Sequence, residues 1–153
     1  MARRIYFERH SLASALGTSL NTTGWGIGQI REGFQSELDI QTPLVTVHFL
    51  PSKYLELQLG RSITTDKTFT RRVQVDCYME TEPRTISIAD DVADFFDEMF
   101  ISITDPTGTV LGKLYCPDST SITIDSLPPN LNEARVLRWR SVIQASLEAD
   151  YIV

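Results

Sequence analysis

The stretch from Phe69 to Phe100, FTRRVQVDCYMETEPRTISIADDVADFFDEMF, decides the fold because it predicts a strand, a polar turn and an amphipathic helix in succession. Over its first ten residues, mainly apolar side chains alternate with mainly polar ones. This period of two residues is typical of a half-buried strand. Pro83 lacks an amide hydrogen, so the strand should end before it. One face of this strand is expected to carry Phe69, Arg71, Val73, Val75 and Cys77.

The second half of the stretch predicts a helix from Ser87 to Phe100, with Ser87 as its N-cap. At about 100° per residue, its side chains separate into an apolar arc and an acidic arc. The apolar arc comprises Ile88, Val92, Phe95, Phe96, Met99 and Phe100. The acidic arc comprises Asp90, Asp91, Asp94, Asp97 and Glu98. No lysine or arginine within the helix neutralises these carboxylates, which indicates either a solvated face or a surface for a basic partner.

The rest of the chain adds one helix and several strands around this unit. A helix is expected over residues 4–16, ended by Gly17. Strands are expected over residues 42–49, 54–59, 69–78, 101–104, 109–116, 121–124 and 136–148. The order predicts a single α+β domain over residues 1–153, with a mainly antiparallel sheet and two helices packed on it.

Residues 17–34 contain five glycines among threonine, asparagine and serine, and they predict a flexible glycine-rich loop or arm. Trp25, Ile27 and Phe34 are apolar residues that a fully solvated loop would not need. They are candidate anchors into a neighbouring subunit or a partner, and packing on their own domain is the alternative.

Composition limits the class of function. The net charge of −6 argues against a protein that grips nucleic acid by its phosphates. Local basic patches remain at Arg71 with Arg72, and at Arg135, Arg138 and Arg140. No apolar run reaches about 18 residues, so no membrane span is expected. The two cysteines, Cys77 and Cys116, lie in predicted strands and are expected to be buried thiols.

Motifs for catalysis or cofactor binding do not emerge. The cluster Gly24–Gly28 has Gln29 where a dinucleotide-binding loop needs its third glycine. His10 and His48 have neither a carboxylate nor a cysteine at a ligand-like interval. The sequence therefore predicts no enzyme activity, no catalytic residue, no cofactor and no metal.

Five segments, taken in order, resemble the tail terminator proteins of tailed bacteriophages. They are PLVTVHF, YLELQLGR, FTRRVQVDCYMETEPR, ISIADDVADFFDEMF and VLRWRSVIQASLEADY, within residues 40–151. The shared phrase is R-x-V-x-V-D, followed by an acidic amphipathic helix and a late R-W-R strand. Other neck and head-completion proteins of phages have a similar size and composition.

The resemblance implies a structural virion protein of the tail or neck, assembled in the host cytoplasm. Such proteins form a homo-oligomeric ring, commonly a hexamer, that caps the tail tube and meets a neck or head-completion protein. Genomic DNA would pass through without specific binding. A ring needs two unlike flanks that meet head to tail. The candidate flanks are a basic strand face with Arg72, Arg138 and Arg140, and an acidic helix face with Asp90, Asp94, Asp97 and Glu98. The alternatives are another phage neck adaptor, or a small hydrolase that uses the acidic helix 87–100.

Overall fold

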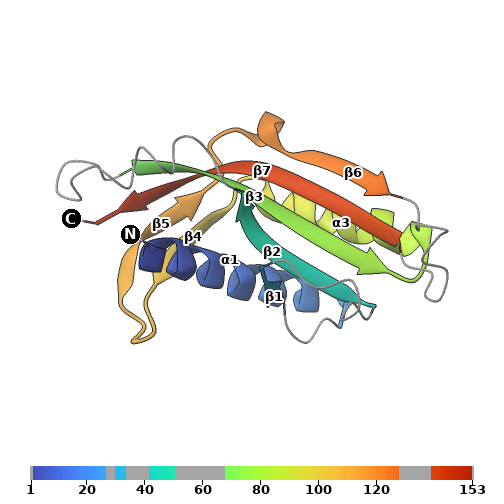
Figure 1. The fold of residues 1–153 in the computed structure, drawn as a ribbon, viewed down its shortest axis with the longest axis horizontal. Helices are drawn as coiled ribbons and strands as arrows, with labels where there is room; N and C mark the ends of the chain where they lie inside the picture. Colours follow the sequence, from blue (N-terminus) through green and yellow to red (C-terminus); the bar gives the residue numbers. More distant parts are fainter. Residues whose placement is uncertain (1, 27–29, 34–41, 51–67, 128–138, 153) are drawn as a thin grey trace.

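The computed structural model describes residues 2–26, 30–33, 42–50, 68–127 and 139–152, which form two α-helices and a curled sheet of seven strands (Figure 1). The helices are α1 (Ala2–Thr22) and α3 (Glu82–Phe96), and a short 3-10 helix, η2, spans Ser119–Ser121. The strands are β1 (Arg31–Glu32), β2 (Leu44–Leu50), β3 (Thr68–Met79), β4 (Phe100–Thr104), β5 (Val110–Tyr115), β6 (Thr123–Leu127) and β7 (Trp139–Tyr151). Within these ranges, no helix has the length and apolar character needed to cross a bilayer.

The sheet is mixed. Its strand order is β1-β2-β3-β7-β5-β4, and β6 also pairs with β7. β1 runs parallel to β2, whereas the other pairings are antiparallel. The predicted α+β class is therefore confirmed, and the sheet is not purely antiparallel. The predicted strand 54–59 lies outside the described residues.

β3 and β7 form the centre of the sheet, and in Figure 1 they run side by side across the molecule. The predicted alternation in β3 is confirmed, because Val73, Val75 and Cys77 are fully buried on the helix side. The opposite residues of β7 on that side are Ala145, Ile143 and Ser141. Ser141 is a polar residue on this apolar face, and its buried hydroxyl donates to Thr85 O of α3 at 3.2 Å.

α1 is longer than predicted, because it passes through Gly17 and ends at Thr22. Leu12, Leu16 and Leu20 recur at helical spacing and are fully buried, so the apolar stripe continues past the glycine. The glycine stop comes seven residues later, at Gly24, which has a φ of 88°. The prediction of a loop is therefore wrong for residues 17–22.

α3 begins earlier than predicted, with Thr81 rather than Ser87 as its N-cap. Pro83 lies in the first turn, where its missing amide hydrogen removes no helical hydrogen bond. The helix ends at Phe96, and Glu98 adopts a left-handed φ of 59° that turns the chain into β4. Phe100 therefore belongs to a strand and is 62% exposed, contrary to its predicted place on the apolar arc.

A turn at Asp105–Gly108 joins β4 to β5 in a hairpin, and the two strands fall where the sequence predicts strands at 101–104 and 109–116. The Asp105 carboxylate accepts hydrogen bonds from the backbone amides of Thr107 and Thr109, both at 2.9 Å. Gly108 supplies the positive φ of 85° that this turn requires. The strand predicted at 121–124 is displaced, because η2 occupies Ser119–Ser121 and β6 follows it.

An ion pair lies inside the core between α1 and β3. The Glu8 carboxylate is fully buried and accepts from Arg71 Nε at 2.8 Å and from Arg71 Nη2 at 3.2 Å. Tyr151 Oη, from β7, donates to the same carboxylate. The prediction of Arg71 as part of a surface basic patch is therefore wrong, since its charge is used within the core.

We expect Phe96→Ala to lower the free energy of unfolding by about 3–5 kcal/mol, because a fully buried aromatic ring leaves a cavity. Phe95 is only half-buried beside it, in an edge-to-face contact of 5.5 Å between ring centroids. Phe95→Ala should therefore cost clearly less, and it serves as the matched control. Urea denaturation measures both, and equal losses would contradict this packing of α3.

Removing one partner of the buried ion pair should be costly, because the other charge stays buried without compensation. We expect Glu8→Leu to lower the free energy of unfolding by about 3–5 kcal/mol. The double variant Glu8→Leu with Arg71→Met should recover much of that loss, because it removes both charges together. Thermal and urea unfolding of the single and double variants decide this, and simple addition of the two single losses would argue against coupling.

Candidate functional site

The acidic face of α3 lies on the surface, as predicted. Asp90, Asp94, Asp97 and Glu98 are exposed, and Asp91 is half-buried. Two of these carboxylates accept hydrogen bonds from other elements. Trp25 Nε1 donates to Asp91 Oδ2 at 2.5 Å, and Ser119 Oγ donates to Asp97 Oδ1 at 2.5 Å. The helix is thus tied down along both flanks of its acidic face.

Trp25 packs against its own chain in this structure. Besides its bond to Asp91, its ring lies 5.7 Å from the guanidinium carbon of Arg84. Of the two packing alternatives for Trp25, the subunit therefore shows the intradomain one, and contact with another subunit is not tested. Ile27 and Phe34, the other two predicted anchors, lie outside the described residues.

The predicted basic strand face is mixed in charge. The face of the sheet away from the helices carries Arg72 and Arg140, as expected from the strand alternation. Arg138 lies outside the described residues. Carboxylates from three strands also lie on this face. They are Asp76 of β3, Asp125 of β6, and Glu148 and Asp150 of β7. The expectation of a basic flank is therefore wrong for the described part of this face.

A buried polar cluster lies on that same face, across β2, β3 and β7. Asp76 and His48 are each 2% exposed. Asp76 Oδ1 accepts from Gln74 Nε2 at 3.0 Å, and Asp76 Oδ2 accepts from Arg140 Nη2 at 3.2 Å. His48 Nε2 lies 4.0 Å from the same oxygen. Gln144 Nε2 donates to Gln74 Oε1 at 2.9 Å, which adds a second residue of β7 to the cluster.

Burial lowers the pKa of His48 below its ordinary value of 6.5. The Asp76 carboxylate opposes this shift, whereas the charges of Arg140 and Arg9 reinforce it. The Asp76 charge is thus matched mainly by Arg140, and His48 stays neutral near pH 7. Among the described residues, no group of three or more His, Cys, Asp or Glu side chains is placed to hold a metal ion.

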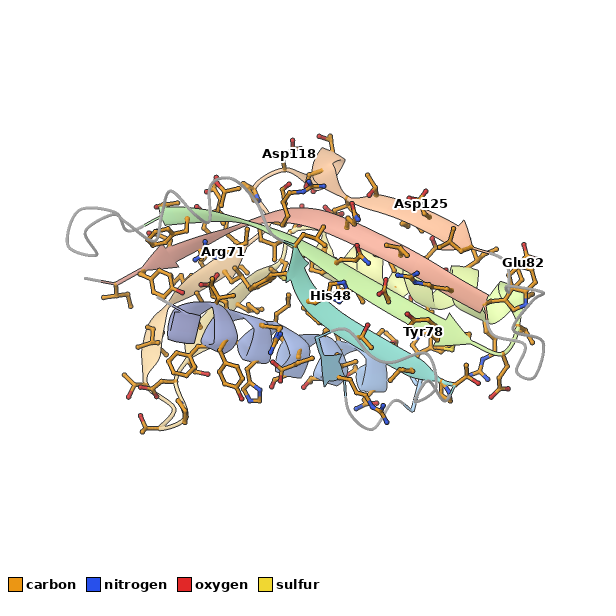
Figure 2. The ribbon with its side chains drawn as sticks, viewed as in Figure 1. His48, Arg71, Tyr78, Glu82, Asp118 and Asp125 are labelled. Carbon is orange, nitrogen blue, oxygen red and sulfur yellow. The ribbon has the colours of Figure 1, made fainter. Side chains whose placement is uncertain are left out.

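Sequence reasoning treated His48 and Asp76 separately, because they are 28 positions apart in the chain. The register of β2 against β3 brings them together. In this ladder His48 pairs with Gln74, and Thr46 pairs with Asp76. Cross-strand neighbours on one face meet in this way, but single-strand periodicity does not fix the register. In Figure 2, His48 lies on the strand next to the one that carries Arg71 and Tyr78.

Two hollows flank the exposed side of α1. One of about 310 Å³ lies between α1 and β1 and is lined by residues such as Ser14, Asn21 and Glu32. A second, of about 490 Å³, lies between α1 and the β4–β5 hairpin. His10 borders both, and its Nδ1 lies 3.0 Å from Glu32 Oε2. Serine and threonine side chains contribute to both linings. Neither hollow gathers the carboxylates of α3.

Both cysteines are buried free thiols, as the sequence predicts. Burial raises the pKa of the Cys77 thiol, and the nearby Asp76 charge adds to the rise. A thiol with a raised pKa stays protonated at neutral pH and is a poor nucleophile. Cys77 is therefore a packing residue of the β3 core.

Comparison with known proteins gives a fold and no family. No protein-family model matches the chain, and no curated protein matches it. A solved structure whose name describes no function is similar to it, with a TM-score of 0.50 and 12% sequence identity. The similarity covers 99% of this chain and 95% of that chain. At such low identity, the likeness supports the α+β fold alone.

We expect His48 to make stability depend on pH. Its folded-state pKa is lowered, so its neutral form contributes stability that is present above about pH 6.5. That contribution is lost as the pH falls from 6.5 towards the lowered pKa, because the unfolded chain binds the proton first. His48→Gln should flatten this part of the stability curve by up to the slope of one proton. Urea unfolding at several pH values measures it, and an unchanged slope in His48→Gln would contradict the prediction.

Proposed function

We propose that this protein is a structural virion subunit of the tail terminator kind. It would form a closed ring that caps a phage tail tube and joins it to the head or neck. The observation that supports this most is the acidic face of α3, carried on a helix that is fixed in place. The segments that resemble tail terminators include β2, β3, α3 and β7, which pack together in one unit.

The acidic face suits contact between subunits better than it suits chemistry. Asp90 and Asp94 project from the exposed side of the helix, and Glu98 is exposed just beyond its end. A carboxylate that acts as a general acid usually needs a buried site that raises its pKa. Carboxylates on a rigid exposed face can instead meet basic side chains of a neighbouring subunit, with little loss of conformational entropy on association.

The net charge also suits a passage for DNA. A subunit with a net charge of −6 repels phosphates at long range, so a ring of such subunits would not hold the genome as it passes. This argument favours a neck or tail position over a DNA-packaging grip. It does not separate a tail terminator from another neck adaptor, which remains the nearest alternative. A small hydrolase that uses the acidic helix is the alternative from another class.

Native mass separates these classes. We expect the purified protein to give a closed higher oligomer, alone or when tail tube protein is added, by native mass spectrometry and negative-stain microscopy. A strict monomer that also ignores tail tubes would overturn the ring. A hydrolase would instead reveal itself by turnover that is lost on Asp90→Asn or Asp94→Asn.

Charge reversal tests the role of the helix face. Asp90→Lys with Asp94→Lys should raise the protein concentration needed for ring assembly by at least about tenfold, because the new lysines would then face basic side chains of the neighbouring subunit. Asp150→Lys makes the same kind of change on the sheet face and should assemble like the parent. If the double variant forms rings at the parental concentration, the acidic face is not the subunit contact.

A further inference from the structure

β6 has one edge paired and one edge open. It pairs with residues 140–144 of β7, while β5 pairs with residues 148–151 of the same strand, so the two strands lie end to end along one edge of β7. All five residues of β6 are exposed. Within the described ranges, no strand pairs with its outer edge. Figure 1 shows β6 along the upper rim of the molecule, beyond β7.

Register identifies which backbone groups face outward. The amide of Ser146 donates to Ser121 Oγ, and the amide of Ile152 donates to Leu111 O, so even-numbered residues of β7 point towards β5 and β6. Backbone direction alternates along a strand, which makes Gln144, Val142 and Arg140 the hydrogen-bonding positions for β6. Their partners are Thr123, Asp125 and Leu127. The backbone groups of Ile124 and Ser126 therefore point to the open edge.

Of the usual protections of an edge strand, β6 carries one, the charge of Asp125. Natural edges are blocked by proline, by charged side chains (lysine above all) or by a bulge. The sequence TIDSL contains neither proline nor lysine, and its register against β7 runs without a bulge. Ile124 and Leu127 are each 41% exposed on this strand, and Ile86 of the neighbouring α3 is 44% exposed. The edge thus offers backbone hydrogen bonds together with apolar side chains.

The surroundings of this edge are acidic. Asp125 lies on β6, Asp118 lies just before it, and α3 brings Asp97 close enough to bond Ser119 of η2. Hydrogen bonds from Thr120 lower the pKa of Asp118, so its charge persists into acid solution. Figure 2 shows Asp118 and Asp125 along the same rim. A strand that docks here would meet carboxylates near the start and at the middle of β6.

We propose that the outer edge of β6 binds an extended, basic segment of a different protein, which adds to the sheet as a further strand. Backbone bonds to Ile124 and Ser126 supply the register, and lysine or arginine side chains pair with the surrounding carboxylates. A second copy of β6 fits less well, since it would bring Asp125 near its own counterpart. This site does not depend on the proposed ring, because a single subunit carries all of it.

The experiment uses the full chain and a short synthetic peptide of alternating valine and lysine. Titration by calorimetry should give saturable binding that weakens with salt. By NMR hydrogen exchange, the amides of Ile124 and Ser126 should exchange fast in the free protein and become protected with peptide. The amide of Asp125 should be protected in both states. Protection of residues elsewhere, with Ile124 and Ser126 unchanged, would overturn the proposal.

Two controls separate strand addition from simple charge attraction. A peptide of the same sequence with methylated backbone amides keeps its charge but cannot donate to the edge, and it should bind about tenfold more weakly. Ile124→Pro removes one outward amide and should weaken binding of the parent peptide to a similar extent, whereas Ile124→Thr keeps the amide and should bind almost as well. Circular dichroism confirms that both variants are folded.

The outcomes are distinct. Equal binding of the methylated peptide means charge attraction alone, and it overturns the site. Self-association that Ile124→Pro abolishes, without peptide binding, means that a second copy occupies the edge, and it overturns the basic partner. Neither result tests ring formation. The oligomeric state of the protein is measured separately, and the titrations are made at concentrations where that state is known.

Discussion

The long antiparallel pairing of β3 with β7 is the constraint on which the rest of the structure depends. It runs without interruption from Thr68 opposite Asp150 to Met79 opposite Trp139. β2 pairs with the other edge of β3, and β5 and β6 share the other edge of β7. A slip of one residue would move every side chain of one strand to the opposite face. That slip would take Arg71 away from Glu8 and would place Asp76 among the core side chains.

Polar side chains on both faces make this register specific. On the helix side, the Glu8 carboxylate receives Arg71 from β3 and Tyr151 from β7, so three elements meet at one buried charge. On the other face, Asp76 receives Gln74 and Arg140. Apolar residues alone would tolerate a slip of two residues, because such a slip keeps each side chain on its own face. A buried charge tolerates only the arrangement that supplies its partner, since an unpaired one costs several kcal/mol.

The two surfaces proposed for partners are neighbours in space because α3 packs against β6. The helix presents carboxylates on a fixed face, and the strand presents open backbone groups and apolar side chains. These surfaces differ in physical character. The helix face attracts by charge and is sensitive to salt, whereas the strand edge adds directional hydrogen bonds. An assembly subunit that contacts unlike partners would benefit from having both, and each can be removed without unfolding the core.

The sequence by itself determined the elements whose signal is local. Alternation specified β3 and most of β7, a helical period specified the two faces of α3, and Asp105–Gly108 specified a hairpin. The predicted ends of helices and strands were wrong where one residue type is compatible with two structural roles. Gly17 lies within α1 beside Ile30 and does not end the helix. Pro83 lies in the first turn of α3 as well as following the preceding strand. The conformation at such positions depends on the tertiary contacts of the residue, and these are not part of its intrinsic helix or strand propensity.

Only the tertiary structure decided which distant side chains meet. The short parallel strand β1, the burial of Arg71 against Glu8 and the cluster of His48 with Asp76 all depend on strand order and register. The open edge of β6 depends on β5 and β6 dividing one side of β7 between them. Periodicity tells which face a residue takes on its own strand. The neighbour on that face comes from pairing across the sheet, because pairing is a property of two segments that the chain brings together only on folding.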